Sequence, residues 1–202
     1  ASECWPLWVL LYLIGSIPFS IITSKIMNLP DPRTFGSKNP GATNILRTGN
    51  KIAALITLIG DSLKGFIPVV IIMGIVEGEV SLITNIATAY FSSFFILIGH
   101  MFSIFLKFNG GKGVATYIGG LVAINFLAGL IFSIIWLVVA KVLKISSMSA
   151  LIATALSPFY FYLITSDMVS TLIIGLISLL IFYTHRDNIK RLVNKEEDVI
   201  QS

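Results

Sequence analysis

The chain has 202 residues, of which 55% are hydrophobic and only 12% charged, and its mean hydropathy is +0.91. These values exclude an ordinary soluble globular protein and indicate a polytopic membrane protein, because about 20 apolar residues form one helix that crosses a bilayer. The formal net charge is +4, and no nucleic-acid partner is expected.

Neither disulfide nor metal chemistry is indicated by the sequence. Cys4 is the only cysteine, which excludes an intrachain disulfide, and the two histidines, His100 and His185, lie far apart along the chain. We therefore expect no metal site and no cofactor. The first apolar segment lacks a basic flank and a small-residue cleavage site, so we expect a retained span. The missing initiator Met suggests a trimmed or tagged start.

Apolar runs of sufficient length predict an all-α integral membrane protein with about seven transmembrane helices. Gly15 and Pro18 lie inside the first run and predict an irregular or closely packed helix there. The run 114–142 is too long for one untilted helix, so we divide it near Asn125. The spans are expected at about residues 5–27, 52–76, 82–105, 114–142 as two helices, 151–164 and 168–184, with short turns at 77–79 and 165–167.

Polar segments interrupt or follow these runs at residues 31–50, 107–113 and 144–149 and in the tail 185–202. The first segment is rich in proline and glycine and is too long for a simple turn. The tail is charged and is expected to be helical. Because no internal repeat divides the spans into similar halves, we expect one polytopic membrane domain over residues 1–202.

The distribution of charge predicts the topology. If the spans alternate, all 14 lysines and arginines lie on or near one side, whereas the opposite loops carry Glu3, Glu77, Glu79 and Asp167 and no cation. The positive-inside rule then places the N-terminus outside and the C-terminus in the cytoplasm, which favours seven spans over six. Much of this basicity is explained by topology and by attraction to anionic lipid headgroups.

The cytoplasmic polar segments share glycines, cations and small hydroxyl or amide side chains, which is the composition of an anion site. We expect these segments to converge on one site, with phosphate as the ligand. The sequence Gly110-Gly111-Lys112-Gly113 opens the fourth span, and a helix N-terminus favours an anion. Taken alone, this motif fits a flexible loop with a topogenic lysine equally well. ATP binding is rejected, because Gly113 follows Lys112 where a P-loop has Ser or Thr.

Asp61 and Lys64 are three residues apart in the second span, so they share a helical face and can form an ion pair. Asp61 lies roughly 15 Å into the membrane, where each charge costs about 2.5 to 3.5 kcal/mol unless it faces protein. Whether this pair contacts substrate or only braces the loop is open, and we favour bracing.

His185 and Asn188 are three residues apart at the end of the last span and share a helical face near Arg191. A single histidine at a membrane interface is usually a polar cap. Its polar neighbours here favour a functional role.

These motifs resemble the bacterial membrane acyl-phosphate:glycerol-3-phosphate acyltransferases, which make lysophosphatidic acid. The similarity covers almost the whole chain with compatible order and spacing. The matching segments are Gly15-Ser16-Ile17-Pro18, residues 31–47, residues 61–68, Gly99-His100, residues 108–116, Ser147 and residues 185–192.

The resemblance implies a multi-pass enzyme of the bacterial plasma (inner) membrane whose active site faces the cytoplasm. Such an enzyme transfers a fatty acyl group from acyl phosphate to the 1-hydroxyl of sn-glycerol 3-phosphate and releases inorganic phosphate, as part of phospholipid biosynthesis. It implies neither a metal nor acyl-CoA. The expected partners are acyl phosphate, glycerol 3-phosphate and the lipid bilayer. The sequence leaves the oligomeric state undefined, and a monomer is compatible with it.

The candidate site residues are chosen for the chemistry of an acyl phosphate, a mixed anhydride with a good leaving group. The protein must mainly hold two anionic substrates together and stabilise the developing oxyanion. The expected catalytic residues are Ser37, Arg47, Lys112, His185 and Asn188. The expected substrate-binding residues are Gly36, Asn39, Gly41, Thr43, Asn44, Gly110, Gly111, Gly113, Ser147 and Ser149. We expect the backbone N–H groups of Gly36 and Gly41 to be donors.

Several positions depart from the pattern that the resemblance implies. Lys38 replaces the usual glycine between Ser37 and Asn39, and Lys195 replaces a glycine in the tail before Glu197. Ser103 occupies a position where proline is common.

The third motif of the family often has two serines three residues apart. Ser147 fits the first of them, but Ala150 takes the second position. Ser149 is the alternative, and which hydroxyl contacts substrate stays open.

The general base is not defined by a motif. Phe105 and Lys190 stand five residues after the two histidines, so the His-x4-Asp pair of the acyl-CoA-using acyltransferases is missing. We hypothesise that a substrate phosphate oxygen takes the hydroxyl proton, with His185 as a weaker candidate.

Two other classes of function are alternatives to the acyltransferase. A transporter or lipid translocator for phosphate-bearing substrates would explain the many spans and the buried charges. It is disfavoured because the polar groups cluster at one face. A membrane phosphatase or phosphotransferase would need an acidic metal cluster or a phospho-accepting histidine, and the sequence indicates neither.

Overall fold

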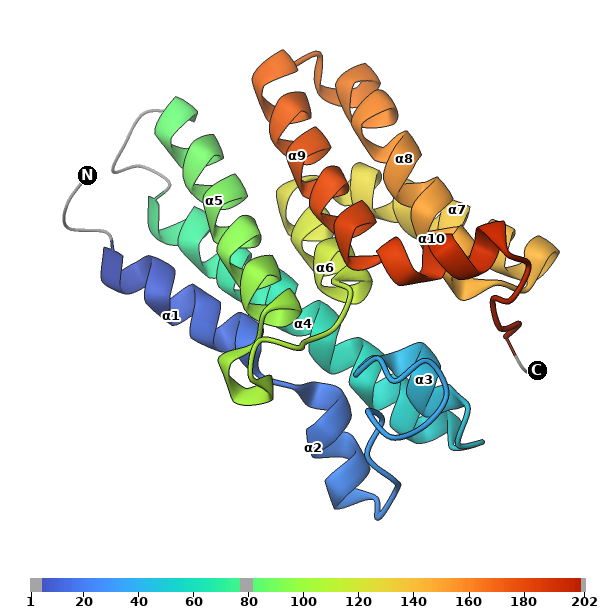
Figure 1. The fold of residues 1–202 in the computed structure, drawn as a ribbon. Helices are drawn as coiled ribbons and strands as arrows, with labels where there is room; N and C mark the ends of the chain where they lie inside the picture. The colour runs from blue at the N-terminus through green and yellow to red at the C-terminus, as the bar shows by residue number, and fades with distance from the viewer. Residues whose placement is uncertain (1–4, 77–81, 201–202) are drawn as a thin grey trace. The chain divides into compact units, whose positions relative to one another are not determined.

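The structure is a computed structural model that describes residues 5–76 and 82–200. All regular secondary structure in these residues is helical (Figure 1). Glu3, Cys4 and the expected turn at residues 77–79 lie outside the described residues. The helices are α1 (Trp5–Ser16), α2 (Phe19–Ile26), α3 (Ala42–Leu46), α4 (Lys51–Val76), α5 (Leu82–Met101), the 3-10 turn η1 (Ile104–Leu106), α6 (Val114–Ile124), α7 (Phe126–Leu143), α8 (Ser146–Thr165), α9 (Met168–Thr184) and α10 (Arg186–Val193).

The described helices have the length and composition of a multi-pass membrane protein. Among them, α4, α5, α7 and α8 each contain a stretch that is long and apolar enough to cross a membrane. The bent pairs α1 with α2 and α9 with α10 add up to two more spans, which gives four to six. Helix α6 has 11 residues and is about 16 Å long, roughly half the hydrocarbon thickness. The seven-span topology and the orientation of the termini remain predictions.

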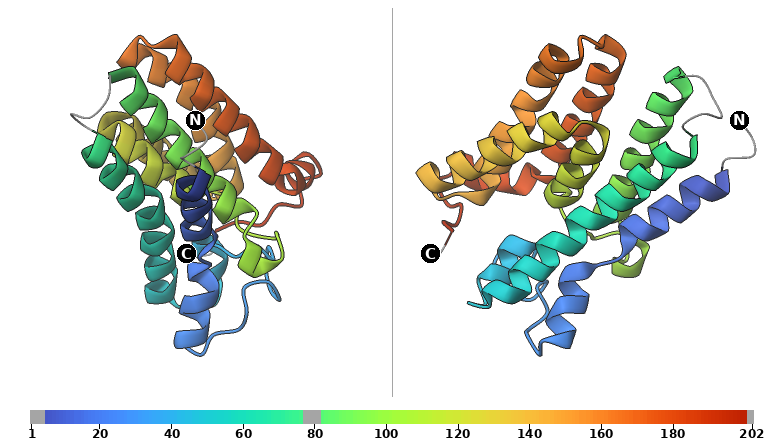
Figure 2. Two further views of the ribbon diagram at one scale, coloured as in Figure 1. Left: turned by 90° about the vertical axis from the view of Figure 1, so that its left-hand side faces the viewer. Right: turned by 180° about the vertical axis from the view of Figure 1, so that it is seen from behind.

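The chain forms two compact units, and the boundary between them in the sequence lies between Ile124 and Asn125. In the first unit, α1 packs on α5, and α4 packs on α5 and α6, while α2 and α3 contact α4 (Figures 1 and 2). Glycines, which have no side chain, allow close contacts between these helices. A Cβ atom on Gly15 would collide with the backbone of Ile96, and one on Gly65 would collide with the backbone of Thr116. Small residues at helix contacts are typical of membrane proteins.

The first span is broken, as Gly15 and Pro18 predict. Helix α1 ends at Ser16, α2 begins at Phe19, and the two helices meet at an angle of 41°. Proline lacks the N–H group that would continue the helical hydrogen bonds, so the helix breaks before it. The prediction of an irregular first span is therefore confirmed.

In the second unit, α7 packs on α8 and α8 packs on α9. The predicted break at Asn125 is confirmed, because the side-chain oxygen of Asn125 accepts the Ala128 N–H at 3.0 Å and caps α7. The expectation of a polar loop at residues 144–149 is wrong in part. Lys144 closes α7 in a left-handed conformation, and α8 already begins at Ser146.

The tail is helical only in its first part, so the prediction of a helical tail is wrong after Val193. Lys195 adopts a left-handed conformation with φ of 61°, and the Glu196 N–H donates to the Arg191 carbonyl at 2.8 Å. This is a common way for a helix to end. The chain then turns back, and the Ile200 N–H donates to the Lys144 carbonyl at 2.6 Å.

Candidate functional site

The polar loop 28–41 in the first unit is organised around Asn44, which lies on α3 and is 2% exposed. Its side-chain NH₂ group donates to the carbonyl oxygens of Pro32 at 2.6 Å and Phe35 at 3.2 Å. Its side-chain oxygen accepts the N–H of Ser37 at 3.1 Å. Both amide hydrogens of Asn44 are used within the loop. These hydrogen bonds fix the conformation of the loop and the position of Ser37 in it.

Gly36 brings the Arg47 side chain against this loop. Its φ of +52° is in the left-handed region, and a Cβ atom there would lie 2.8 Å from Arg47 Nη1 and closer still to Asn44 Oδ1. A residue with a side chain would therefore push the guanidinium away from the turn before Ser37. Within this unit the predicted residues Gly36, Ser37, Asn44 and Arg47 are close neighbours.

The glycine loop, residues 109–113, packs its backbone against the end of α5. The Gly110 N–H donates to the Met101 carbonyl and the Gly111 N–H donates to the His100 carbonyl, each at 3.0 Å. A Cβ atom on Gly111 would collide with the imidazole of His100. The glycines therefore permit a close approach to α5.

The N–H groups of three motif glycines have acceptors within the protein, so the expectation that the Gly41 N–H is a donor to substrate is wrong. Gly110 and Gly111 donate to α5, and the Gly41 N–H donates to the Asn39 carbonyl at 2.9 Å. As the sequence predicts, the donors that this loop offers an anion are expected at the first turn of α6, which begins at Val114 immediately after Gly113. Lys112 is half-buried beside that turn.

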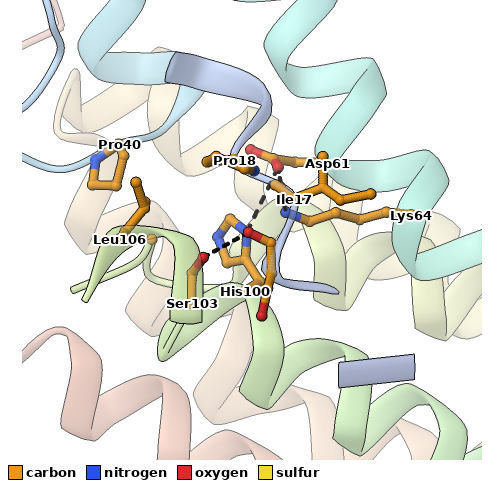
Figure 3. A pocket seen from close by; sticks show the side chains of 10 residues that line it. Ile17, Pro18, Pro40, Asp61, Lys64, His100, Ser103 and Leu106 are labelled. Atoms are coloured by element: carbon orange, nitrogen blue, oxygen red, sulfur yellow. Dashed lines mark hydrogen bonds and ion pairs between the residues drawn. The ribbon is translucent and has the colours of Figure 1, made fainter. Parts of the chain in front are cut away.

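A small pocket in the first unit is lined by both polar loops. Pro40 comes from the first loop and Gly111 from the glycine loop, so the two predicted loops meet here (Figure 3). The remaining lining residues come from the α1–α2 break and from helices α4 and α5 with η1: Ser16, Ile17, Pro18, Asp61, Lys64, His100, Ser103 and Leu106.

Asp61, Lys64 and His100 are buried together at this pocket. Lys64 Nζ lies 2.8 Å from Asp61 Oδ1, and His100 Nδ1 lies 3.6 Å from the same oxygen. Lys64 Nζ also donates to the Ile17 carbonyl at 2.7 Å. These contacts show that the pair braces the α1–α2 break, and its bracing of the loop stays a prediction.

In the second unit, three side chains converge on the Glu197 carboxylate. Ser147 Oγ donates to it at 2.8 Å, Asn188 Nδ2 at 2.5 Å and Arg191 Nε at 2.7 Å. Burial raises the pKa of Glu197, but the hydrogen bonds from Asn188, Ser147 and Arg191 outweigh this effect, and the pKa is lowered from its ordinary value. The carboxylate is therefore charged at neutral pH and holds the tail against α8 and α10.

The two serines of the third motif have different partners. Ser147 bonds to Glu197, whereas Ser149 is fully buried and donates to the Ile145 carbonyl one turn earlier at 2.8 Å. Of the two hydroxyls, that of Ser147 belongs to the polar cluster.

His185 lies at the junction of α9 and α10 and is 2% exposed. Its Nδ1 is 2.8 Å from the Ile181 carbonyl oxygen. Because a carbonyl can only accept, Nδ1 carries the hydrogen, and in the neutral ring Nε2 is the basic nitrogen. The convergence of His185 and Asn188 with the loops of the first unit stays a prediction.

The family model for glycerol-3-phosphate acyltransferase matches residues 5–195 of the chain. The chain belongs to this family. A glycerol-3-phosphate acyltransferase of Ruthia magnifica subsp. Calyptogena magnifica is 56% identical over 194 residues, which are 96% of this chain and 95% of the relative. One of Nitrosomonas eutropha is 44% identical and is matched over 92% of each chain.

Crystal structures of an integral membrane glycerol 3-phosphate acyltransferase, PlsY (YgiH), have the same fold at 31% identity. The glycerol 3-phosphate form has a TM-score of 0.86 and the match covers 96% of this acyltransferase and 94% of the solved chain. The lysophosphatidic acid form has a TM-score of 0.83 and is covered to 93%. The resemblance inferred from the sequence is confirmed, and the acyltransferase is a multi-pass membrane protein. Family membership favours it over the transporter and the phosphatase.

Two departures from the family pattern fall where this acyltransferase has left-handed backbone. Lys38 has φ of 56° and Lys195 has φ of 61°. Glycine reaches this region without strain, whereas a lysine Cβ crowds the following carbonyl oxygen. Lys38 and Lys195 therefore hold these two turns with strain that a glycine would not have.

Sequence reasoning missed two residues of these clusters. Glu197 was noted only as a neighbour of Lys195, and His100 only as part of a matching segment. The signal for His100 was a histidine at the end of an apolar span, close in sequence to the glycine loop. For Glu197, the signal was an acidic residue six positions after Arg191, in a tail that also carries Asp187, Glu196 and Asp198.

Proposed function

We propose that this acyltransferase transfers a fatty acyl group from acyl phosphate to the 1-hydroxyl of sn-glycerol 3-phosphate, giving lysophosphatidic acid and inorganic phosphate. The observation that carries the proposal is the family match over residues 5–195, together with the likeness to a protein solved in glycerol 3-phosphate and lysophosphatidic acid forms. Acyl phosphate as donor suits a site that is rich in cations and that lacks the His-x4-Asp pair.

The proposed site consists of Ser37, Arg47, Lys112, His185 and Asn188. The Arg47 side chain lies against Gly36 of the first polar loop, and Lys112 follows Gly111 in the glycine loop. Both loops line one pocket of the first unit, through Pro40 and Gly111. Lys112 precedes the first turn of α6, where backbone N–H groups and the helix dipole favour an anion. These groups are suited to hold the phosphate of the acceptor and the leaving phosphate of the donor.

In the proposed reaction, the 1-hydroxyl oxygen attacks the acyl carbonyl carbon, and the bond from that carbon to the phosphate oxygen breaks. The hydroxyl proton passes to a phosphate oxygen, so that inorganic phosphate leaves with it. The protein's contribution is to align two anions and to stabilise the oxyanion with Ser37 and its neighbours. His185 Nε2 is the second candidate for the proton, because the Ile181 carbonyl holds Nδ1 in its protonated form.

The donor is tested with purified protein in detergent, acyl phosphate and glycerol 3-phosphate. We expect inorganic phosphate and lysophosphatidic acid in equal amounts, no product with acyl-CoA, and unchanged turnover with a metal chelator. Product from acyl-CoA alone would overturn the proposed donor, and loss of activity with the chelator would overturn the metal-free reaction.

The base is tested with His185→Ala in the same assay. Unchanged turnover would dismiss the histidine. Complete loss with intact glycerol 3-phosphate binding would count against the substrate as the base.

We further propose that the enzyme lies in the bacterial inner membrane with seven spans, its N-terminus outside and its proposed site in the cytoplasm. The charge asymmetry between the loops supports this orientation. A seventh span requires that the short helix α6 contributes to crossing the membrane.

A further inference from the structure

We propose that Asp61, Lys64 and His100 form a positioning network that fixes the glycine loop 109–113, and through it Lys112, against the ends of α1 and α5. The inference deepens the proposed function and rests on it, because it takes Lys112 to contact a substrate phosphate. Of the three residues, His100 contacts the loop, and Asp61 and Lys64 hold His100 and the helices, so the network acts through Lys112.

The network begins at the break between α1 and α2. The Ile21 N–H donates to the Pro18 carbonyl, which leaves the Ile17 carbonyl outside the regular helical pattern. Lys64 Nζ donates to this Ile17 oxygen at 2.7 Å. The ammonium thus fixes α4 to the broken span.

Asp61 links this ammonium to α5. Its Oδ1 lies 2.8 Å from Lys64 Nζ and 3.6 Å from His100 Nδ1, and the side chains of Asp61 and Lys64 are only 4% and 3% exposed. Figure 3 shows the three side chains facing one another across the pocket. The carboxylate therefore joins a residue of α4 to the last turn of α5.

His100 contacts the glycine loop in two ways. Its carbonyl accepts the Gly111 N–H at 3.0 Å, and its imidazole fills the space that a Cβ atom on Gly111 would need. Lys112 is the next residue along the chain. A displacement of His100 therefore moves the peptide unit that carries Lys112.

Neutral hydrogen bonds already join α1 to the end of α5. Ser103 Oγ donates to the Ser16 carbonyl and the Tyr12 hydroxyl donates to the Phe102 carbonyl, each at 2.6 Å. Charged groups inside a membrane protein are costly, and an ordinary packing contact does not need them. Because Asp61, Lys64 and His100 line the same pocket as Gly111, we infer that they control the position of the glycine loop.

The test is a double-mutant cycle between His100→Leu and Lys112→Met, measured as kcat/KM with acyl phosphate and glycerol 3-phosphate. We expect each single variant to lose about tenfold or more, because a misplacement of 1 Å can cost about 100-fold. The double variant should lose no more than Lys112→Met alone, within about twofold. Losses that multiply in the double variant would overturn the inference, because a role in folding alone acts independently of Lys112.

A second test is whether a conservative substitution at His100 retains the activity that His100→Leu loses. His100→Asn keeps an N–H donor close to the position of Nδ1, so we expect it to recover most of the activity that His100→Leu loses. Equal losses in the two variants would overturn the polar link to Asp61. Lys25→Met, which removes an exposed lysine from α2, is the matched control for loss of a cation.

If His100→Leu does not fold, the double change Asp61→Asn with Lys64→Met takes its place in the cycle, because it removes both buried charges together. The same coupling with Lys112→Met is expected. If the wild-type protein does not use acyl phosphate, that result refutes the proposed donor and not the positioning network. Full activity in Lys112→Met would overturn the inference while the donor assay stands.

Discussion

Ser147 donates a hydrogen bond to the Glu197 carboxylate at 2.8 Å, although 50 residues separate them in the sequence. The contact depends on the turn at Lys195, which brings the tail back toward the first turn of α8. Asn188, one of the expected catalytic residues, donates to the same carboxylate. The position of Asn188 is therefore determined by a residue outside the predicted catalytic set.

The stability of this cluster should depend on pH through Glu197. Its pKa is lowered in the folded protein, so its contribution is present above the ordinary glutamate pKa and is lost as the pH falls through the lowered value. We expect Glu197→Gln to be less stable than wild type at pH 7 by on the order of 1 kcal/mol. The difference should shrink as the pH falls below about 4. Unfolding in detergent across this pH range measures it, and a difference that does not change with pH would refute the assignment.

Ser147 and Ser149 should differ in their effect on activity. Ser147→Ala removes a donor to Glu197, so we expect kcat/KM to fall by about tenfold, equivalent to one charge-assisted hydrogen bond. Ser149→Ala removes only a bond to the preceding turn of α8 and should cause a smaller loss. Measuring kcat/KM for both variants at equal purity shows which of the two hydroxyls matters more for activity. A larger loss in Ser149→Ala would show that Ser149 has taken over the role of the missing second serine.

Replacing either of the two lysines with left-handed backbone, Lys38 or Lys195, by glycine should stabilise the protein. We expect Lys38→Gly and Lys195→Gly each to raise the free energy of unfolding by about 0.5 to 1 kcal/mol, because the relief of left-handed strain exceeds the entropy that glycine adds to the unfolded chain. Lys190→Gly, inside α10, is the matched control and should cost about 1 kcal/mol. Equal effects of all three changes on thermal unfolding would contradict the conformational explanation.

Local signals predicted much of the fold. Pro18 marked the break in the first span, Asn125 marked a helix start, and the last span, Met168–Thr184, has the expected bounds. These features follow from residues that act on their own neighbours in the chain.

The glycine loop and the tail were harder to predict. A glycine that exposes its N–H and one that packs against a helix have the same sequence signature, so the use of the Gly110 and Gly111 N–H groups by α5 was not predictable. The return of the tail depends on a left-handed turn at Lys195, which a lysine does not indicate. Glu197 was missed for that reason.

The buried pair at the α1–α2 break should make a large contribution to stability. Lys64→Met leaves the Asp61 carboxylate without its ion pair and the Ile17 carbonyl without its donor. Breaking one partner of a buried pair costs about 3 to 5 kcal/mol, so we expect a large fall in the free energy of unfolding in mixed micelles. Lys25→Met should have little effect. Comparable stability of the two variants would show that Asp61 is compensated by another group.

The membrane topology can be tested at two exposed positions of the second unit. In a Cys4→Ser background, which removes the only native cysteine, Ser166→Cys lies in the turn between α8 and α9 and Asn194→Cys follows α10. Because the turn at 165–167 carries Asp167 and no cation whereas the tail carries Arg186, Lys190, Arg191 and Lys195, we expect an impermeant maleimide to label Ser166→Cys in intact spheroplasts and Asn194→Cys only after permeabilisation. Permeabilised cells, in which both variants should react, provide the control for accessibility. Labelling of Asn194→Cys in intact spheroplasts would place the tail outside, and with it the Glu197 cluster and Asn188, where cytoplasmic substrates could not reach them.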